Sequence, residues 1–347
     1  MAELPAALGA AIDALMEGRQ RGDLHARAGR ISHAYRAGAT STGVVREAGD
    51  ALAYAVSRLP ATYAAVRHVL DRLVERCPDF APASGLDVGA GPGTASWAMA
   101  EAFPTLSALT QVDCNRAFLD LARTLAADAV STALRQPVQR LADLVGKAPL
   151  PQSDLVVLGY ALAELAQPSQ GEVVERLWAA TAGALVIVEP GTPAGYQRIL
   201  AARDVLIGLQ AKILAPCPHQ APCPLVAPDW CHFAVRLSRS RDHMAAKAAT
   251  LGYEDEKFSY LVAVRPALFK EANAGRILDR PETSKIAVAA KLCGTDGTVA
   301  VALVPRRQKP AYAAARRLRW GDELRLGRNA AEADASPEPD ASPDCLD

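Results

Sequence analysis

Apolar residues recur every three to four positions through the first eighty residues of the chain. This spacing places them on one face of a helix. The residues that follow it most clearly are Leu52, Val56, Leu59, Val66, Val69, Leu70 and Leu73. The pattern predicts a helical N-terminal region over residues 1–80.

After residue 85 the pattern changes to short apolar runs separated by helical stretches. The runs are residues 86–88, 109–112, 154–158 and 185–188, and the helical stretches between them are 95–102, 116–127 and 171–180. Strands that alternate with helices of this length predict βαβ units and a parallel sheet. We therefore expect an α/β fold with a Rossmann-like core over residues 81–205.

The alternation ends after about residue 205. The segment APCPHQAPCPLVAPDWCHF holds too many prolines for a regular helix. A last core strand is expected at 258–264, and two further apolar runs, 286–292 and 298–304, flank Asp296-Gly297. Asp-Gly between such runs is a hairpin signal. Residues 206–328 thus predict a cysteine-containing loop, the last core strand and a small β module.

Global charge excludes some classes of protein. Lys plus Arg and Asp plus Glu both number 38, so the chain is not a uniformly basic nucleic-acid binder. We expect no membrane partner, since no apolar run reaches the ~18 residues that a span needs. Acidic residues at Glu3, Asp13 and Glu17 argue against a secretory signal. These features favour a cytoplasmic location.

The C-terminal region is locally basic. Residues 285–328 hold ten basic and three acidic residues. Arginine suits phosphate contact, and Tyr312 and Trp320 offer stacking surfaces. The candidate RNA-binding residues are Arg306, Arg307, Lys309, Arg316, Arg317 and Arg319. A solvated helix face is the competing interpretation.

The last residues of the sequence are acidic, in contrast to the basic region before them. Residues 329–347 contain six acids and three prolines without a Lys or Arg. Such a composition cannot build a core and predicts a disordered acidic tail.

A glycine loop follows the first predicted strand. Gly89, Gly91 and Gly93 form G-x-G-x-G, whereas dinucleotide-binding folds require a glycine where Thr94 stands. With Asp87 two residues before the first glycine, the loop resembles motif I of class I S-adenosylmethionine-dependent methyltransferases. A tight strand–helix turn without a ligand is the competing interpretation.

The resemblance implies two further cofactor contacts. Asp113, at the end of the second predicted strand, would hold the ribose hydroxyls, and Asp143, after the third, would lie beside the adenine. Residues 159–164 after the fourth strand lack both the Asn/Asp-Pro-Pro-aromatic and the Pro-Cys motifs of nucleic-acid methylases. The catalytic residues are therefore unknown, and enzymatic activity stays open.

Four cysteines form a candidate metal site. Cys217, Cys223 and Cys231 are separated by five and seven residues, and sixty-one residues lie between Cys231 and Cys293. These gaps are wider than those of structural zinc knuckles, so zinc and an iron–sulfur cluster are both open. His219 and His232 are substitute ligands. Buried cysteines acting as small hydrophobic residues are the competing interpretation.

Several segments together resemble one family. Besides the glycine loop, they are the Cys-Pro segment with Asp229-Trp230-Cys231-His232-Phe233, the block Tyr253-Glu254-Asp255-Glu256-Lys257-Phe258-Ser259-Tyr260, Lys291-Leu292-Cys293-Gly294 and Trp320-Gly321-Asp322. They resemble the methyltransferase-like assembly factors of the mitochondrial small ribosomal subunit and their bacterial relatives, over residues 30–325.

This resemblance implies a class I methyltransferase fold with a [4Fe-4S] cluster on Cys217, Cys223, Cys231 and Cys293, zinc being the alternative. It also implies S-adenosylmethionine as cofactor and the small ribosomal subunit and its rRNA as partners. The function expected is small-subunit assembly, with rRNA methylation left open. A methyltransferase of a small molecule or protein, with no ribosome role, is the competing hypothesis. The oligomeric state is unknown.

Overall fold

A mixed eight-stranded sheet forms the centre of the molecule. The computed structural model describes residues 2–146 and 148–325. The sheet order is β3 (Val138–Leu141), β2 (Ala108–Asp113), β1 (Ser84–Val88), β4 (Ser153–Gly159), β5 (Thr181–Pro190), β8 (Tyr253–Val264) and β6 (Lys212–Ala215), and β7 (Phe233–Ser238) also pairs with β8. Strands β1 to β5 are parallel, and β8 runs antiparallel to β5 and β6. The predicted α/β class is confirmed, as a class I methyltransferase-like fold with a central mixed sheet.

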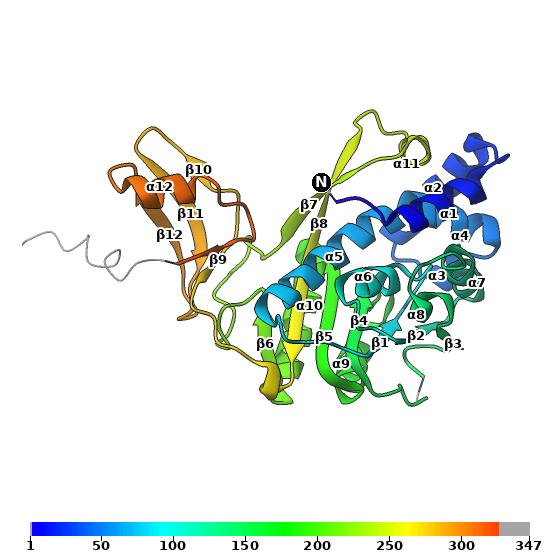
Figure 1. Ribbon diagram of the computed structural model, residues 1–347, viewed down its shortest axis with the longest axis horizontal. Coiled ribbons are helices and arrows are strands. Elements are labelled where there is room, and N and C mark those ends of the chain that lie inside the picture. The colour runs from blue at the N-terminus through cyan, green and yellow to red at the C-terminus, as the bar shows by residue number, and fades with distance from the viewer. Residues whose placement is uncertain (1, 147, 326–347) are drawn as a thin grey trace, which may run out of the picture.

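Helices cover both faces of this sheet (Figure 1). On one face lie α5 (Leu59–Arg76), α6 (Thr94–Ala102) and α7 (Arg116–Leu125), and on the other α9 (Gln167–Ala179) and α10 (Pro193–Gly208). The middle of β4, residues 155–158, is continuously apolar because both of its faces are buried. Leu155 and Val157 enter one core, and Val156 enters the other. A strand buried on both faces has no solvent side to make polar.

The first residues form helices, as their apolar spacing predicts. They are α1 (Ala6–Met16), α2 (Arg21–Arg36), α3 (Ser41–Val44) and α4 (Ala48–Ser57), followed by α5. Helix α4 packs on α2 and α7, which brings this region to the β2–β3 side of the sheet (Figure 1). The N-terminal region therefore covers one end of the core.

A second, smaller sheet stands beyond the β6 edge of the core (Figure 1). It contains β9 (Gly275–Ile277), β10 (Glu282–Thr283), β11 (Ala287–Cys293), β12 (Val299–Pro305) and β13 (Glu323–Leu324), with α12 (Lys309–Ala315) packed on it. The predicted hairpin is confirmed, because β11 and β12 pair antiparallel around a turn in which Gly297 has a φ of +80°. We call residues 275–324 the C-terminal module.

Some elements differ from the sequence expectation. The last core strand begins at Tyr253 and not near 258, because its first half pairs with β7. Strands β6 and β7 flank the proline-rich segment and were not predicted. The predicted acidic tail, residues 329–347, lies outside the described residues, which end at 325. Within residues 2–146 and 148–325, no helix combines the length and apolarity needed to cross a membrane.

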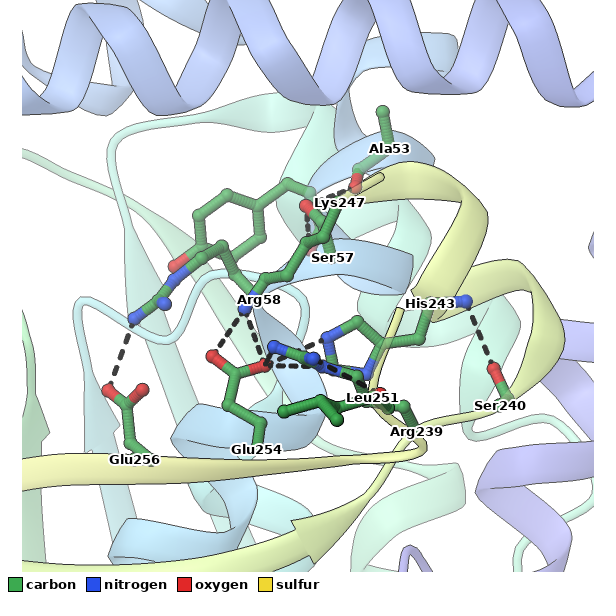
Figure 2. A network of polar contacts seen from close by, with 11 residues as sticks. Ala53, Ser57, Arg58, Arg239, Ser240, His243, Lys247, Leu251, Glu254 and Glu256 are labelled. Atoms are coloured by element: carbon green, nitrogen blue, oxygen red, sulfur yellow. Dashed lines mark hydrogen bonds and ion pairs between the residues drawn. The ribbon is translucent and has the colours of Figure 1, made fainter. Parts of the chain in front are cut away.

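A partly buried carboxylate ties the β7–β8 ribbon to the short helix α11 (Arg241–Ala246). Glu254 on β8 lies 2.6 Å from Lys247, 3.2 Å from Arg239 and 3.3 Å from His243 (Figure 2). Burial alone would raise the pKa of Glu254, but hydrogen bonds from His243 and Lys247 outweigh it and hold the pKa well below its ordinary value. Glu254 is therefore charged in the folded chain at neutral pH.

We expect Glu254→Gln to lower the free energy of unfolding at pH 7 by about 3 kcal/mol, since it leaves buried cations without their anion. A carboxyl whose pKa is lowered by folding stabilises the protein above its unfolded pKa of about 4.3, and this contribution is lost as the pH falls. The gap between wild type and variant should thus shrink below that pH in urea titrations. Asp255→Asn is the matched control, because the Asp255–Arg236 pair is largely exposed; an equal loss in both variants would contradict the prediction.

Candidate functional site

The glycine loop joins β1 to α6 at the point where the strand order of the sheet reverses. Gly89, Gly91 and Gly93 all have positive φ angles, of +65°, +52° and +77°. A Cβ on Gly89 would lie 2.7 Å from the Cβ of Ala161, and one on Gly93 would lie 3.0 Å from Nε2 of Gln111. A Cβ on Gly91 would meet no described atom within 4 Å. Packing therefore requires Gly89 and Gly93, whereas Gly91 faces open space.

Asp113, at the end of β2, lies directly beside the loop. Its Oδ2 accepts a hydrogen bond from the backbone N–H of Gly91 at 2.7 Å, and its Oδ1 accepts one from that of Asn115 at 2.7 Å. Burial raises the pKa of Asp113, and these backbone donors only partly oppose the rise. The structure thus places Asp113, which the sequence analysis assigned to the ribose, directly beside Gly91 of the glycine loop.

The other two predicted acids occupy different positions. Asp87 is buried beneath α6, where its Oδ2 accepts from the backbone N–H of Ser96 at 2.8 Å and from its hydroxyl at 2.6 Å. Burial raises the pKa of Asp87 to about 7 against these donors. Asp143 lines a separate hollow with Val88, the last residue of β1, and Val112, the last but one of β2. Asp87 therefore anchors the loop, and Asp143 borders the neighbouring hollow.

Sequence reasoning missed a polar group that follows β4. Tyr160 has a φ of +60°, a conformation that is rare for a non-glycine residue and concentrates at functional sites. Its hydroxyl donates to Glu256 at 3.0 Å. Arg58 lies 3.4 Å from the same carboxylate, as Figure 2 shows. The only signal in the sequence was the position of Tyr160 directly after a predicted strand.

The N-terminal region also contributes to this edge of the sheet. The backbone N–H of Ser41 donates to Glu164 at 2.7 Å, and the Asn115 amide donates to the carbonyl of Val45 at 2.9 Å. Residues 41–45 therefore lie against the loops that follow β2 and β4, a contact that no local pattern in the sequence indicates.

The four predicted metal ligands line one recess. Cys217, Cys223 and Cys231 come from the segment between β6 and β7, and Cys293 comes from the end of β11. We call this the cysteine recess. All four are free thiols. Burial raises the pKa of Cys231 well above its ordinary value, and the neighbouring thiols add to the rise.

Two polar side chains touch the thiols. The Tyr196 hydroxyl lies 3.2 Å from Sγ of Cys223, and Nε2 of His219 lies 3.3 Å from Sγ of Cys293. His232 instead stacks on Trp230 and meets Trp320 edge-to-face. In the described part of the chain, no group of three or more His, Cys, Asp or Glu side chains is arranged to hold a metal ion. The cysteines are thus assembled, but the expected metal module is not shown.

The predicted RNA-binding residues lie on the outside of the C-terminal module. Six side chains are exposed, namely Arg306, Arg307, Lys309, Arg316, Arg317 and Arg319. The two aromatic candidates are engaged elsewhere: the Tyr312 hydroxyl donates to the Ser284 carbonyl at 2.9 Å, and Trp320 packs on His232. Lys291 forms an ion pair with Asp229. The basic surface therefore consists mainly of arginines, and both candidate stacking residues, Tyr312 and Trp320, already make a contact within the chain.

Comparison with known proteins gives a match over most of the chain. The family model described as mitochondrial small ribosomal subunit Rsm22 matches residues 48–325. The human mitochondrial ribosome assembly protein METTL17 is 31% identical over 294 residues, which cover 80% of this chain and 62% of that protein. The mitochondrial Rsm22-cox11 tandem protein 2 of Schizosaccharomyces pombe is 26% identical over 323 residues, covering 78% and 42% respectively. The chain thus spans less than two thirds of the length of these relatives.

The likeness to solved structures is distant. Magnesium protoporphyrin IX methyltransferase from Synechocystis PCC 6803, with bound SAH, is 15% identical and covers 59% of this chain and 83% of its own, with a TM-score of 0.40. A likeness this low does not bear on ligand or reaction.

The comparisons correct one expectation. The family model and the curated relatives are all described as mitochondrial. This finding overturns the cytoplasmic location expected from the sequence. Net charge and the residues at the beginning of the chain do not identify a compartment.

Proposed function

The chain belongs to the family described as mitochondrial small ribosomal subunit Rsm22, and from this premise we propose that it acts in small-subunit assembly by binding rRNA. The observation that carries the proposal is the extent of the family match, residues 48–325, which includes the glycine loop, the cysteine recess and the C-terminal module. Assembly is named for the human relative, and we extend it to this chain.

The proposed RNA contact is the arginine-rich outside of the C-terminal module. Its six exposed cations stand on a chain of zero net charge, so they concentrate positive charge at one place. Phosphate contacts of this kind position a protein on RNA without reading its sequence. Binding to rRNA through this surface therefore needs no catalytic step.

The proposed cofactor site is the glycine loop with Asp113. S-adenosylmethionine fits the observations because a Cβ on Gly91 would enter open space and because the Asp113 carboxylate can accept from ribose hydroxyls. The N-terminus of α6 offers further N–H groups. Asp87, Gly89 and Gly93 would shape the loop, and Asp143 would border the adenine. The bound cofactor would supply a methyl group, but no residue here is assigned as a catalytic base.

The proposed metal centre is the cysteine recess. Four free thiols from a loop and a distant strand suit zinc or a [4Fe-4S] cluster. Of the two, the [4Fe-4S] cluster is the group that the family resemblance implies, and it is the one we propose. Cys217, Cys223, Cys231 and Cys293 would hold it, and their sulfurs would join the segment after β6 to β11.

Gly91→Arg should abolish binding of S-adenosylmethionine, because its side chain fills the space beside the loop. Asp113→Ala should weaken binding about 10- to 100-fold, because it removes the charge-assisted hydrogen bonds to the ribose. Isothermal titration calorimetry measures both. Gly38→Arg is the matched control, since Gly38 also has positive φ (+84°) and open space at its Cβ but lies in the N-terminal region. Wild-type affinity in Gly91→Arg and Asp113→Ala, as in the control, would remove the pocket from the proposal.

A separate assay of labelled-methyl transfer to rRNA would distinguish an enzyme from a pure assembly factor.

Cys231→Ser or Cys293→Ser should remove the metal and lower the melting temperature of anaerobically purified protein, because metal binding contributes to folding. Iron, sulfide and zinc analysis gives the readout. Cys114→Ser is the control, since Cys114 is an exposed thiol outside the recess. A colourless wild type with one zinc would retain the ligands and reject the cluster, and a wild type without metal would reject the centre.

Neutralising Arg316, Arg317 and Arg319 to Ala should weaken small-subunit rRNA binding and reduce the slope of log affinity against log salt by roughly 0.7–0.9 per lost phosphate contact. Filter binding across a salt series measures this. The matched control replaces the exposed Arg19, Arg123 and Arg241, which lie outside the module. Equal effects in both triple variants would mean that the module is not the RNA contact.

A further inference from the structure

Arg203 on α10 is a buried cation at the wall of the cysteine recess. Only 2% of it is exposed, and it lines the recess beside Cys217 and Cys293. Its Nη2 donates to the carbonyl of Ala221 at 2.6 Å and points toward that of His219 at 3.4 Å. The guanidinium thus holds the backbone between the first two cysteines from the side of the core.

The charge of Arg203 is not matched by a close carboxylate. Within the residues described, the nearest is Asp204 at 4.0 Å, and its side chain is 78% exposed. Nε of Arg203 has no hydrogen-bond partner in that same part of the chain. Arg276, which lines the recess as well, has its anion in Glu323 at 2.9 Å. A buried charge without a partner is strongly unfavourable.

We infer that Arg203 is the internal counter-ion of the metal centre proposed for Cys217, Cys223, Cys231 and Cys293. The inference rests on that proposed centre. Four thiolates carry more negative charge than either zinc or an oxidised [4Fe-4S] core neutralises, so the loaded recess is an anion. Arg203 is a positioning residue, which stabilises the sulfur ligands and holds their backbone without binding the metal.

This role has opposite consequences for the empty and the loaded protein. In the empty protein Arg203 is a buried cation without an anion, so replacing it with an apolar residue of similar length relieves an unfavourable burial. In the loaded protein the same replacement removes the counter-charge of the centre. A residue that only packs would affect both forms in the same direction.

The test compares wild type, Arg203→Met and Arg203→Lys in the full chain, each stripped of metal and then loaded either with zinc or, anaerobically, with ferrous iron and sulfide. Arg198→Met is the matched control: Arg198 lies on the same helix but is paired with Glu189 at 2.5 Å. Thermal unfolding of the stripped and loaded forms, zinc affinity by chelator competition and the midpoint potential of the iron-loaded form are measured.

We expect stripped Arg203→Met to be at least as stable as stripped wild type, and its zinc affinity to fall about 10- to 100-fold, as for other residues that support metal ligands. Its iron-loaded midpoint potential should move negative, because a lost cation disfavours the added electron. Arg203→Lys should restore most of the potential, and Arg198→Met should lower stability equally in both forms without changing zinc affinity.

Two results overturn the inference, and they are distinguishable from each other. If wild type binds zinc or iron but Arg203→Met keeps the wild-type affinity and potential, Arg203 is only a packing residue and the cysteine centre stands. If wild type binds neither metal, the centre itself is rejected and the counter-ion role with it.

Discussion

The pairing of β8 is the constraint on which both candidate sites depend. This strand pairs with β5, β6 and β7, so the cysteine-bearing segment, which leaves β6 and returns as β7, has both ends fixed to one strand. The hydroxyl of Ser259 adds a hydrogen bond to the Cys231 carbonyl at 2.8 Å. Because side chains alternate along a strand, a slip of one residue would exchange its two buried faces. The register is therefore strongly specified, and the recess is fixed with it.

The same strand also connects the sites to the N-terminal helices. Glu254 and Glu256 lie in its first half, where Glu254 meets His243 of α11 and Glu256 meets Arg58 (Figure 2). Glu256 also accepts from the Tyr160 hydroxyl. The contacts of Glu256 join residues far apart in the chain, since Arg58 is 198 positions away and Tyr160 is 96 positions away. Polar groups buried in a low-dielectric interior hold fixed geometry only when each finds a partner. The N-terminal region is thus part of the site's support and not an appendage.

The C-terminal module depends on few contacts for its position. It has a small core of its own, which includes Ile277 and Leu292. Arg276 donates to the carbonyls of Pro216 at 3.1 Å and Gly321 at 2.8 Å, and so joins the module to the start of the cysteine-bearing segment. Cys293 brings the end of β11 to the recess. In the proposed function, the recess therefore sets where the basic surface stands relative to the core.

The sequence by itself determined the features that depend on local spacing. Apolar period predicted the N-terminal helices and the parallel strands, Asp296-Gly297 predicted the hairpin, and the glycine loop predicted the turn from the first core strand into a helix. Short-range patterns suffice here because helix faces, strand alternation and turn geometry are fixed by a few neighbouring residues.

Only the tertiary structure decided which distant groups meet. Arg58 and Glu256 are 198 positions apart, and nothing near either residue indicates the other. The sequence grouped the four cysteines but gave no sign that Arg203, on a core helix, would be buried among them without a close carboxylate. Such encounters follow from the packing of helices on a sheet, which brings side chains together whatever their distance along the chain. A charge that is buried in this way is unfavourable unless it finds a partner.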